Sequence, residues 1–128
     1  MTVKIVRLGI ARLPDEGPRI GTVRRPPRGV SKENYAAENW FDLWYPDLAP
    51  SAKLMKQGKA AMTDAQWKVF VRAFKAEMAA PTASRTLDLL AALSHETDFS
   101  IGCYCENEER CHRSVLHQLL KDRGASLS

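Results

Sequence analysis

Residues 99–122 decide the fold, and they read FSIGCYCENEERCHRSVLHQLLKD. The apolar run Phe99–Cys103 predicts a strand, and the amphipathic pattern from Glu108 to Asp122 predicts a helix with Asn107 as its N-cap. A strand–loop–helix unit places its loop at the carboxyl end of the strand. Ligands of α/β proteins bind there, because the amides at the start of the helix point to that edge. The segment therefore predicts an α/β protein with a site at this loop.

The rest of the chain supplies a second strand and several helices. Residues Thr2–Leu8 predict a strand that is covered on both faces, since Val3 and Ile5 alternate with Val6 and Leu8. Helical spacing and capping residues predict four earlier helices. Ser31 is the expected N-cap of a helix over 31–38, and Ser51 that of a helix over 51–57. The capping box of Thr63 and Gln66 begins a helix over 64–79, and Thr82 or Ser84 caps a further helix that ends near Ser94. The fold class is α/β, a single small domain over residues 1–128 with a mainly parallel sheet flanked by helices.

The N-terminal quarter of the chain is basic and irregular. Residues 1–32 hold eight Lys or Arg against two acids, a charge of +6, whereas the remaining 96 residues hold 11 against 13, a charge of −2. Prolines and glycines interrupt residues 12–29, a loop long enough to suggest function. Residues Thr22–Arg25 are expected to add a short strand. The basic charge would attract an anionic ligand, and the competing interpretation is a solvated surface without a ligand.

Composition limits the class of protein. The 128 residues are 45% hydrophobic and 27% charged, which is ordinary for one globular domain. No apolar stretch approaches the roughly 20 residues of a membrane span, and the first residues lack the features of a signal peptide. Three cysteines in one cluster do not form the disulfide framework of a secreted protein. We therefore expect a cytoplasmic protein with reduced thiols and no membrane partner.

The aromatic side chains are expected to lie in the core rather than to stack on bases. Their spacing is typical of buried helix faces and short strands. They are Trp40, Trp44, Tyr45, Trp67, Phe70 and Phe74. Tyr35 is a candidate donor at the rim of a pocket.

Metal binding is one interpretation of the cysteine-rich segment. Cys103, Cys105, Cys111 and His112 offer the thiolate and imidazole ligands that zinc binds tetrahedrally. Their spacing, however, is not that of two Cys-x2-Cys knuckles. Residues 111 and 112 in one helix would also point about 100° apart. The preferred interpretation assigns no metal and no cofactor.

Thiol chemistry is a second interpretation. A cysteine near a helix N-terminus and cations favours its thiolate, so Cys105 or Cys111 could act as a nucleophile. His112 is the candidate for proton transfer, because an unperturbed imidazole titrates near neutral pH. The segment lacks the Cys-x5-Arg pattern of phosphatases, since four residues separate Cys105 from Arg110. Acidic neighbours at 106, 108 and 109 would oppose thiolate formation.

Anion binding is the third interpretation and the preferred one. Arg113 follows the predicted helix start, and Arg24, Arg25 and Arg28 lie in the basic loop. A guanidinium donates two parallel hydrogen bonds to a phosphate or carboxylate. Tyr104 is the candidate hydroxyl beside them. Taken one at a time, the cysteines are better explained as small buried hydrophobic residues.

The chain resembles the domain of unknown function 488 family of small bacterial proteins. Three segments carry the resemblance, in order along nearly the whole chain: 24–32, 44–51 and the Cys-Tyr-Cys … Cys-His-Arg-Ser residues of 103–114. The resemblance implies a compact α/β domain in which the arginine loop and the cysteine–histidine–arginine segment converge. It implies no established activity. A sister group lacks the cysteines, so a metal would not be the purpose that the family shares.

The sequence thus predicts a protein that binds an anionic small molecule at the strand–loop–helix site. Whether it also catalyses a reaction stays open. A basic module that associates with nucleic acid is the first alternative, which the balanced charge beyond residue 32 disfavours. A zinc-stabilised structural domain is the second.

Overall fold

The computed structural model describes residues 1–105 and 110–128 and contains a four-stranded, all-parallel sheet. The strands lie in the order β1-β4-β2-β3. Their bounds are β1 Val3–Arg7, β2 Arg19–Gly21, β3 Leu43–Trp44 and β4 Phe99–Cys103. The predicted α/β class with a parallel sheet is confirmed. Because all strands run the same way, their carboxyl ends share one edge of the sheet.

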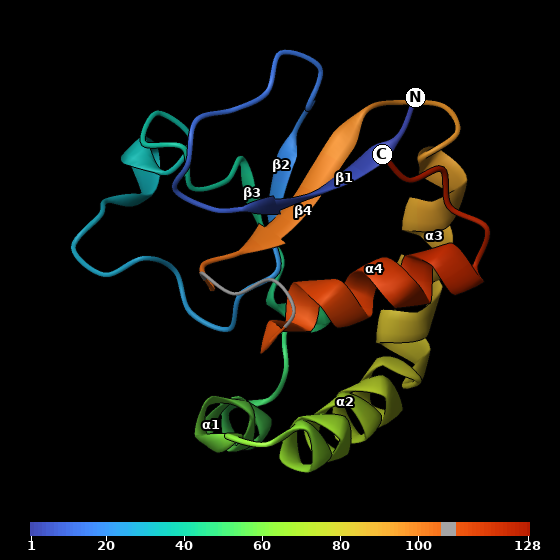
Figure 1. Cartoon of the computed structure of the whole chain (residues 1–128). Coiled ribbons are helices and arrows are strands. Elements are labelled where there is room, and N and C mark those ends of the chain that lie inside the picture. The colour runs from blue at the N-terminus through green and yellow to red at the C-terminus, as the bar shows by residue number, and fades with distance from the viewer. Residues whose placement is uncertain (106–109) are drawn as a thin grey trace.

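Four α-helices lie on one side of the sheet, and the irregular N-terminal segments lie away from them (Figure 1). The helices are α1 Ala52–Ala60, α2 Asp64–Met78, α3 Pro81–Leu93 and α4 His112–Asp122, and two 3-10 turns are η1 Lys32–Asn34 and η2 Pro46–Leu48. None of the helices in the described part of the chain combines the length and the hydrophobicity that a membrane span requires.

Two clusters of buried side chains hold these layers together. The larger packs α2, α3 and α4 on the sheet, with Phe74, Leu87, Ile101 and Leu116 fully covered. The smaller lies toward the carboxyl edge, where the irregular segment contributes Phe41. The predicted covering of β1 on both faces is confirmed, since Val3 and Val6, which point to opposite faces of the strand, are both buried.

Capping residues define two helix starts as predicted. The Thr63 hydroxyl accepts from the Gln66 amide, and the Gln66 side chain accepts from the Thr63 amide, which completes the capping box. Ser51 accepts from the Leu54 amide at the start of α1. This helix continues through Gly58 to Ala60, three residues beyond its predicted end.

Two elements of the basic N-terminal region were predicted wrongly. The second strand is Arg19–Gly21 rather than Thr22–Arg25, because Arg19 pairs with Ser100 of β4 and its side chain is buried. Residues 31–38 form only the short turn η1. Ser31 makes no side-chain cap there, and no residue of the turn is buried. A helix without an apolar face has no packing to stabilise it.

The helix predicted from Glu108 to Asp122 is shorter in the structure. Cys111 is the N-cap, so α4 begins at His112 rather than near residue 108. The expected cap Asn107 and the glutamates beside it lie outside the described residues.

Two further predictions differ from the structure. The helix α3 begins at Pro81 with Ala80 as its N-cap, without the side-chain cap expected of Thr82 or Ser84. Trp44, expected in the core, is 40% exposed.

Candidate functional site

A pocket of about 570 Å³ lies at the carboxyl edge of the sheet. We call it the carboxyl-edge pocket. Its walls come from the segment after β2, the end of β4, the first residue of α4 and one face of α1. The lining residues are Val23, Arg24, Arg25, Ala52, Met55, Lys56, Lys59, Cys103, Tyr104, Cys105 and His112. The volume is in the range of small-molecule sites, and the mixed lining suits a ligand with both an apolar and a polar part.

The lining carries four basic side chains, Arg24, Arg25, Lys56 and Lys59, and no acidic one among the described residues. Arg24 is half-buried and fixed in place: its Nε donates to the Pro50 carbonyl and its Nη2 to the Ala49 carbonyl, each at 2.9 Å. The other three are exposed and form no ion pair within the described part of the chain. Within the described residues, the positive charge of this lining therefore has no acidic counterpart.

His112 closes the pocket on the side of α4. The ring is 3% exposed, packs edge-on against Phe74, and its Nε2 faces the Thr22 carbonyl oxygen. A carbonyl only accepts, so Nε2 carries the proton and Nδ1 is left with its lone pair. Burial lowers the pKa of His112 to about 4, although the Thr22 hydrogen bond opposes the shift. The imidazole is therefore neutral at pH 7.

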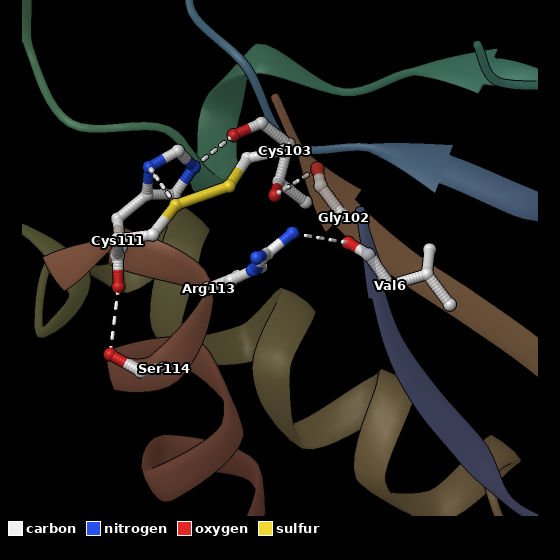
Figure 2. Close-up of a disulfide and its surroundings, with 8 residues drawn as sticks. Val6, Gly102, Cys103, Cys111, Arg113 and Ser114 are labelled. Atoms are coloured by element: carbon white, nitrogen blue, oxygen red, sulfur yellow. Dashed lines mark hydrogen bonds between the residues drawn. A yellow bond between two sulfur atoms is a disulfide. The ribbon is translucent and has the colours of Figure 1, made fainter. Parts of the chain in front are cut away.

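The three cysteines have two different environments. Cys103 and Cys111 are buried, and their sulfurs are joined as a disulfide between the end of β4 and the start of α4 (Figure 2). The expected set of three reduced thiols is thus not what the structure contains. Cys105 is free and half-buried. Burial raises the pKa of the Cys105 thiol, and the nearby positive charges of Arg113 and Lys59 offset this only in part.

Two predicted arginines lie outside the carboxyl-edge pocket. Arg113 is 4% exposed and its Nη1 donates to the Val6 carbonyl at 3.3 Å (Figure 2). It therefore ties α4 to β1. Arg28 lines a neighbouring hollow of about 540 Å³ together with Arg7 and Trp40.

Tyr104 separates the two hollows and lines both. Its hydroxyl donates to the Arg25 carbonyl at 3.1 Å, and its ring packs edge-on against Trp40. Burial raises the pKa of this phenol, so the hydroxyl stays protonated. Tyr35, expected at a pocket rim, instead packs edge-on against Phe41.

The structure brings together six of the residues that the sequence singled out. They are Arg24, Arg25, Cys103, Tyr104, Cys105 and His112. Cys111 does not line this pocket. It lines a smaller cavity of about 60 Å³, together with Cys105 and His112. The buried atoms of Cys103, Cys111 and His112 that could bind a metal lie within 4.8 Å of one another.

Sequence reasoning missed Lys56 and Lys59. The signal in the sequence is the spacing of Lys53, Lys56 and Lys59, which keeps three ammonium groups near one side of a helix. That spacing alone does not say which side faces the sheet. The packing of α1 beyond the end of β4 decides it.

A family model, described as the active DUF488-N3 subclade, matches residues 3–124. The chain belongs to this family. A search of curated proteins and a search of solved structures each find no match.

Proposed function

We propose that this DUF488-N3 member binds a small organic anion, with a phosphate or carboxylate group, in the carboxyl-edge pocket. The observation that carries the proposal is the gathering of Arg24, Arg25, Lys56 and Lys59 around one cavity whose described lining has no acid. A bound anion would supply a counter-charge that the described lining does not contain. A pocket with apolar walls also strengthens each charge-assisted hydrogen bond relative to water.

The position of each basic group suits this role. Arg24 is pre-oriented by two backbone carbonyls, so its position is fixed before any ligand binds. Lys56 and Lys59 reach the pocket from α1, and Arg25 from the segment after β2. Val23 and Met55 supply an apolar wall for the organic part of the ligand. An anion with an apolar or aromatic body is therefore favoured over a bare inorganic ion.

The internal ion pairs favour this function over a nucleic-acid surface. Of the basic residues in the N-terminal region, Lys4 pairs with Asp15 at 3.6 Å and Arg12 with Asp42 at 2.7 Å. Arg19 is buried against Glu16. These three cations are already compensated, which reduces the charge available for a broad contact with phosphates.

Catalysis would depend on the two reactive side chains of the same pocket. His112 is neutral and could accept a proton only at Nδ1, since Nε2 is bound to Thr22. Cys105 is a thiol whose raised pKa leaves little thiolate at pH 7. A bound anion would raise the Cys105 pKa further. Binding is therefore the core of the proposal, and no covalent step is included.

Calorimetric titration tests the proposal with phenyl phosphate as the probe and phenol as its uncharged match. We expect phenyl phosphate to bind and phenol not to bind. Lys56→Ala with Lys59→Ala should weaken binding roughly tenfold to a hundredfold, because a hydrogen bond to a charged group contributes about 1.5–3 kcal/mol net and an exposed lysine contributes less than that. The matched control is Lys68→Ala with Lys75→Ala, which removes the same charge from exposed positions of α2 off the pocket. Equal weakening by both pairs would reject the pocket.

A further inference from the structure

Three buried side chains form a compact donor cluster behind the carboxyl-edge pocket. Cys103 is the last residue of β4, Cys111 is the N-cap of α4, and His112 is its first residue. Their exposed fractions are 1%, 1% and 3%. The two sulfurs and one ring nitrogen lie within 4.8 Å of one another. Two thiolates and an imidazole are the ligand set of many zinc sites.

The histidine of this cluster is oriented as a metal ligand would be. Its Nε2 donates to the Thr22 carbonyl, which fixes the ring and leaves the Nδ1 lone pair available. Nδ1 lies 3.9 Å from the Cys111 sulfur. Metal-bound histidines commonly donate their second ring nitrogen to a backbone carbonyl in this way. The structure thus presents a pre-oriented donor beside two sulfurs.

The local backbone removes the objection that the sequence raised against metal binding. Adjacent ligands in one helix would diverge, but Cys111 is not helical: its φ is −127° and its ψ is 147°. The change from extended to helical backbone between residues 111 and 112 turns both side chains toward Cys103. The start of α4 also favours thiolates, because its free amides and dipole attract negative charge.

The backbone separation of the two cysteines fits an intervening ion. Their Cα atoms are 7.7 Å apart, whereas disulfide-linked residues usually lie about 4.4–6.8 Å apart. Two sulfurs that each bind one zinc ion at about 2.3 Å need more room than two that bond directly. The same backbone therefore accommodates two thiolates that bind one zinc ion between them.

We propose that the reduced protein binds one Zn²⁺ through Cys103, Cys111 and His112, with the fourth position open to the carboxyl-edge pocket. Cys103 and His112 line that pocket as well, so the ion would form part of its wall. Cys105 lies on the lining but outside the donor cluster. Three protein ligands and one open position are the arrangement of zinc sites that bind a water or a substrate. This inference does not depend on anion binding.

Metal binding and the disulfide exclude each other. Reduction takes two electrons and two protons from a thiol reductant, which is itself oxidised to a disulfide, and gives two cysteine thiols. Each thiol then loses its proton as it binds the ion. His112 is neutral already and releases none. Zinc binding by this cluster is therefore confined to the reduced protein.

The test titrates the reduced, metal-free chain with Co²⁺ and then displaces it with Zn²⁺. We expect one Co²⁺ per chain, with thiolate-to-cobalt charge-transfer absorption and the intense visible bands of a tetrahedral ion. Cys103→Ser and Cys111→Ser each remove a ligand, so each should weaken binding by more than the roughly 10–100-fold that the loss of a ligand's hydrogen-bond partner costs. Cys105→Ser is the matched control and should retain it. Absence of the charge-transfer band, or equal loss in Cys105→Ser, would overturn the proposal.

A second measurement, on the wild-type chain, tests the proposal even if the cysteine variants fail to fold. Zinc X-ray absorption on the wild-type chain should find two sulfur ligands and one imidazole nitrogen per ion, and three sulfurs would contradict the assignment. The Lys56→Ala, Lys59→Ala chain separates this proposal from anion binding, since it should bind phenyl phosphate more weakly and bind Co²⁺ as the wild type does. If the wild type binds phenyl phosphate but not Co²⁺, the pocket stands and the metal site is wrong.

Discussion

The two ends of the parallel sheet use arginine in opposite ways. At the amino-terminal end, the Arg19 guanidinium is fully buried against Glu16 and also donates to the Ile10 and Asn39 carbonyls. At the carboxyl end, Arg25 is exposed beside a pocket and has no carboxylate partner in the described part of the chain. An arginine-rich sequence therefore does not by itself indicate binding. Only those cations that the fold leaves uncompensated are available to a ligand.

The largest expected effect comes from breaking the buried pair. Arg19→Met leaves the Glu16 carboxylate buried without its partner, so we expect a loss of about 3–5 kcal/mol in the free energy of unfolding. Urea denaturation measures it. The double variant Glu16→Met with Arg19→Met should lose clearly less than the sum of the two single variants, because no lone charge remains. Additive losses would mean that the pair is not coupled.

Acid should weaken the same end of the sheet. Burial alone would raise the pKa of Glu16, but hydrogen bonds from Arg19, the Leu13 amide and Ser100 lower it from 4.5 to about 2. A carboxyl group with a lowered folded-state pKa stabilises the fold above its unfolded pKa, and this stability is lost as pH falls from about 4.5 to 2. We expect a loss of about 3 kcal/mol in that interval.

Urea midpoints of the wild type and Glu16→Gln at several pH values measure this contribution. The difference between the two chains should shrink as pH falls through the interval, because protonation removes the charge that the variant lacks. A constant difference would show that the charge of Glu16 is not what stabilises the fold.

Arg24 should show both roles at once. Arg24→Ala removes two hydrogen bonds to the Ala49 and Pro50 carbonyls, at a cost of about 1–3 kcal/mol. It should also weaken phenyl phosphate binding. Arg25→Ala should weaken binding with little change in stability, since only its backbone carbonyl has a described partner, the Tyr104 hydroxyl. Thermal unfolding and calorimetry on both variants check this. A clear loss of stability in Arg25→Ala would contradict the prediction that the Arg25 side chain serves binding and not the fold.

The smallest stability effect is expected from the lysines of α1. Lys56→Ala with Lys59→Ala should change the free energy of unfolding by no more than about 0.5 kcal/mol, because both side chains are exposed and unpaired in the described structure. Removing neighbouring like charges should if anything stabilise the chain. A marked loss of stability in urea would show that these lysines serve the fold rather than a ligand.

Periodic and capped segments of the fold were predictable from the sequence. The strand Phe99–Cys103 and the capping box before α2 follow from local patterns, and both are confirmed. The strand Arg19–Gly21 was missed because its arginine is buried by a partner, Glu16, that no periodicity reveals. The start of α4 was misplaced because Cys111 caps it without a side-chain hydrogen bond.

Only those residues of the site that lie close together in the sequence could be predicted to lie together in space. Tyr104, Cys105 and His112 come from the deciding segment, and a strand followed by a helix already places them at one edge. Arg113 was expected beside them, but one step along a helix turns it toward Val6 and into the interior. Lys56 required the position of α1 in space, which depends on long-range packing and not on local sequence.

Amide NMR shifts during a titration with phenyl phosphate would show where the ligand binds, because they report both ends of the sheet in one experiment. We expect the largest changes on residues 23–25, 52–59 and 103–105, with the amides around Glu16 and Arg19 unchanged. Changes centred on the Glu16–Arg19 end, or spread evenly over the basic N-terminal residues, would contradict a dedicated anion pocket at the carboxyl edge.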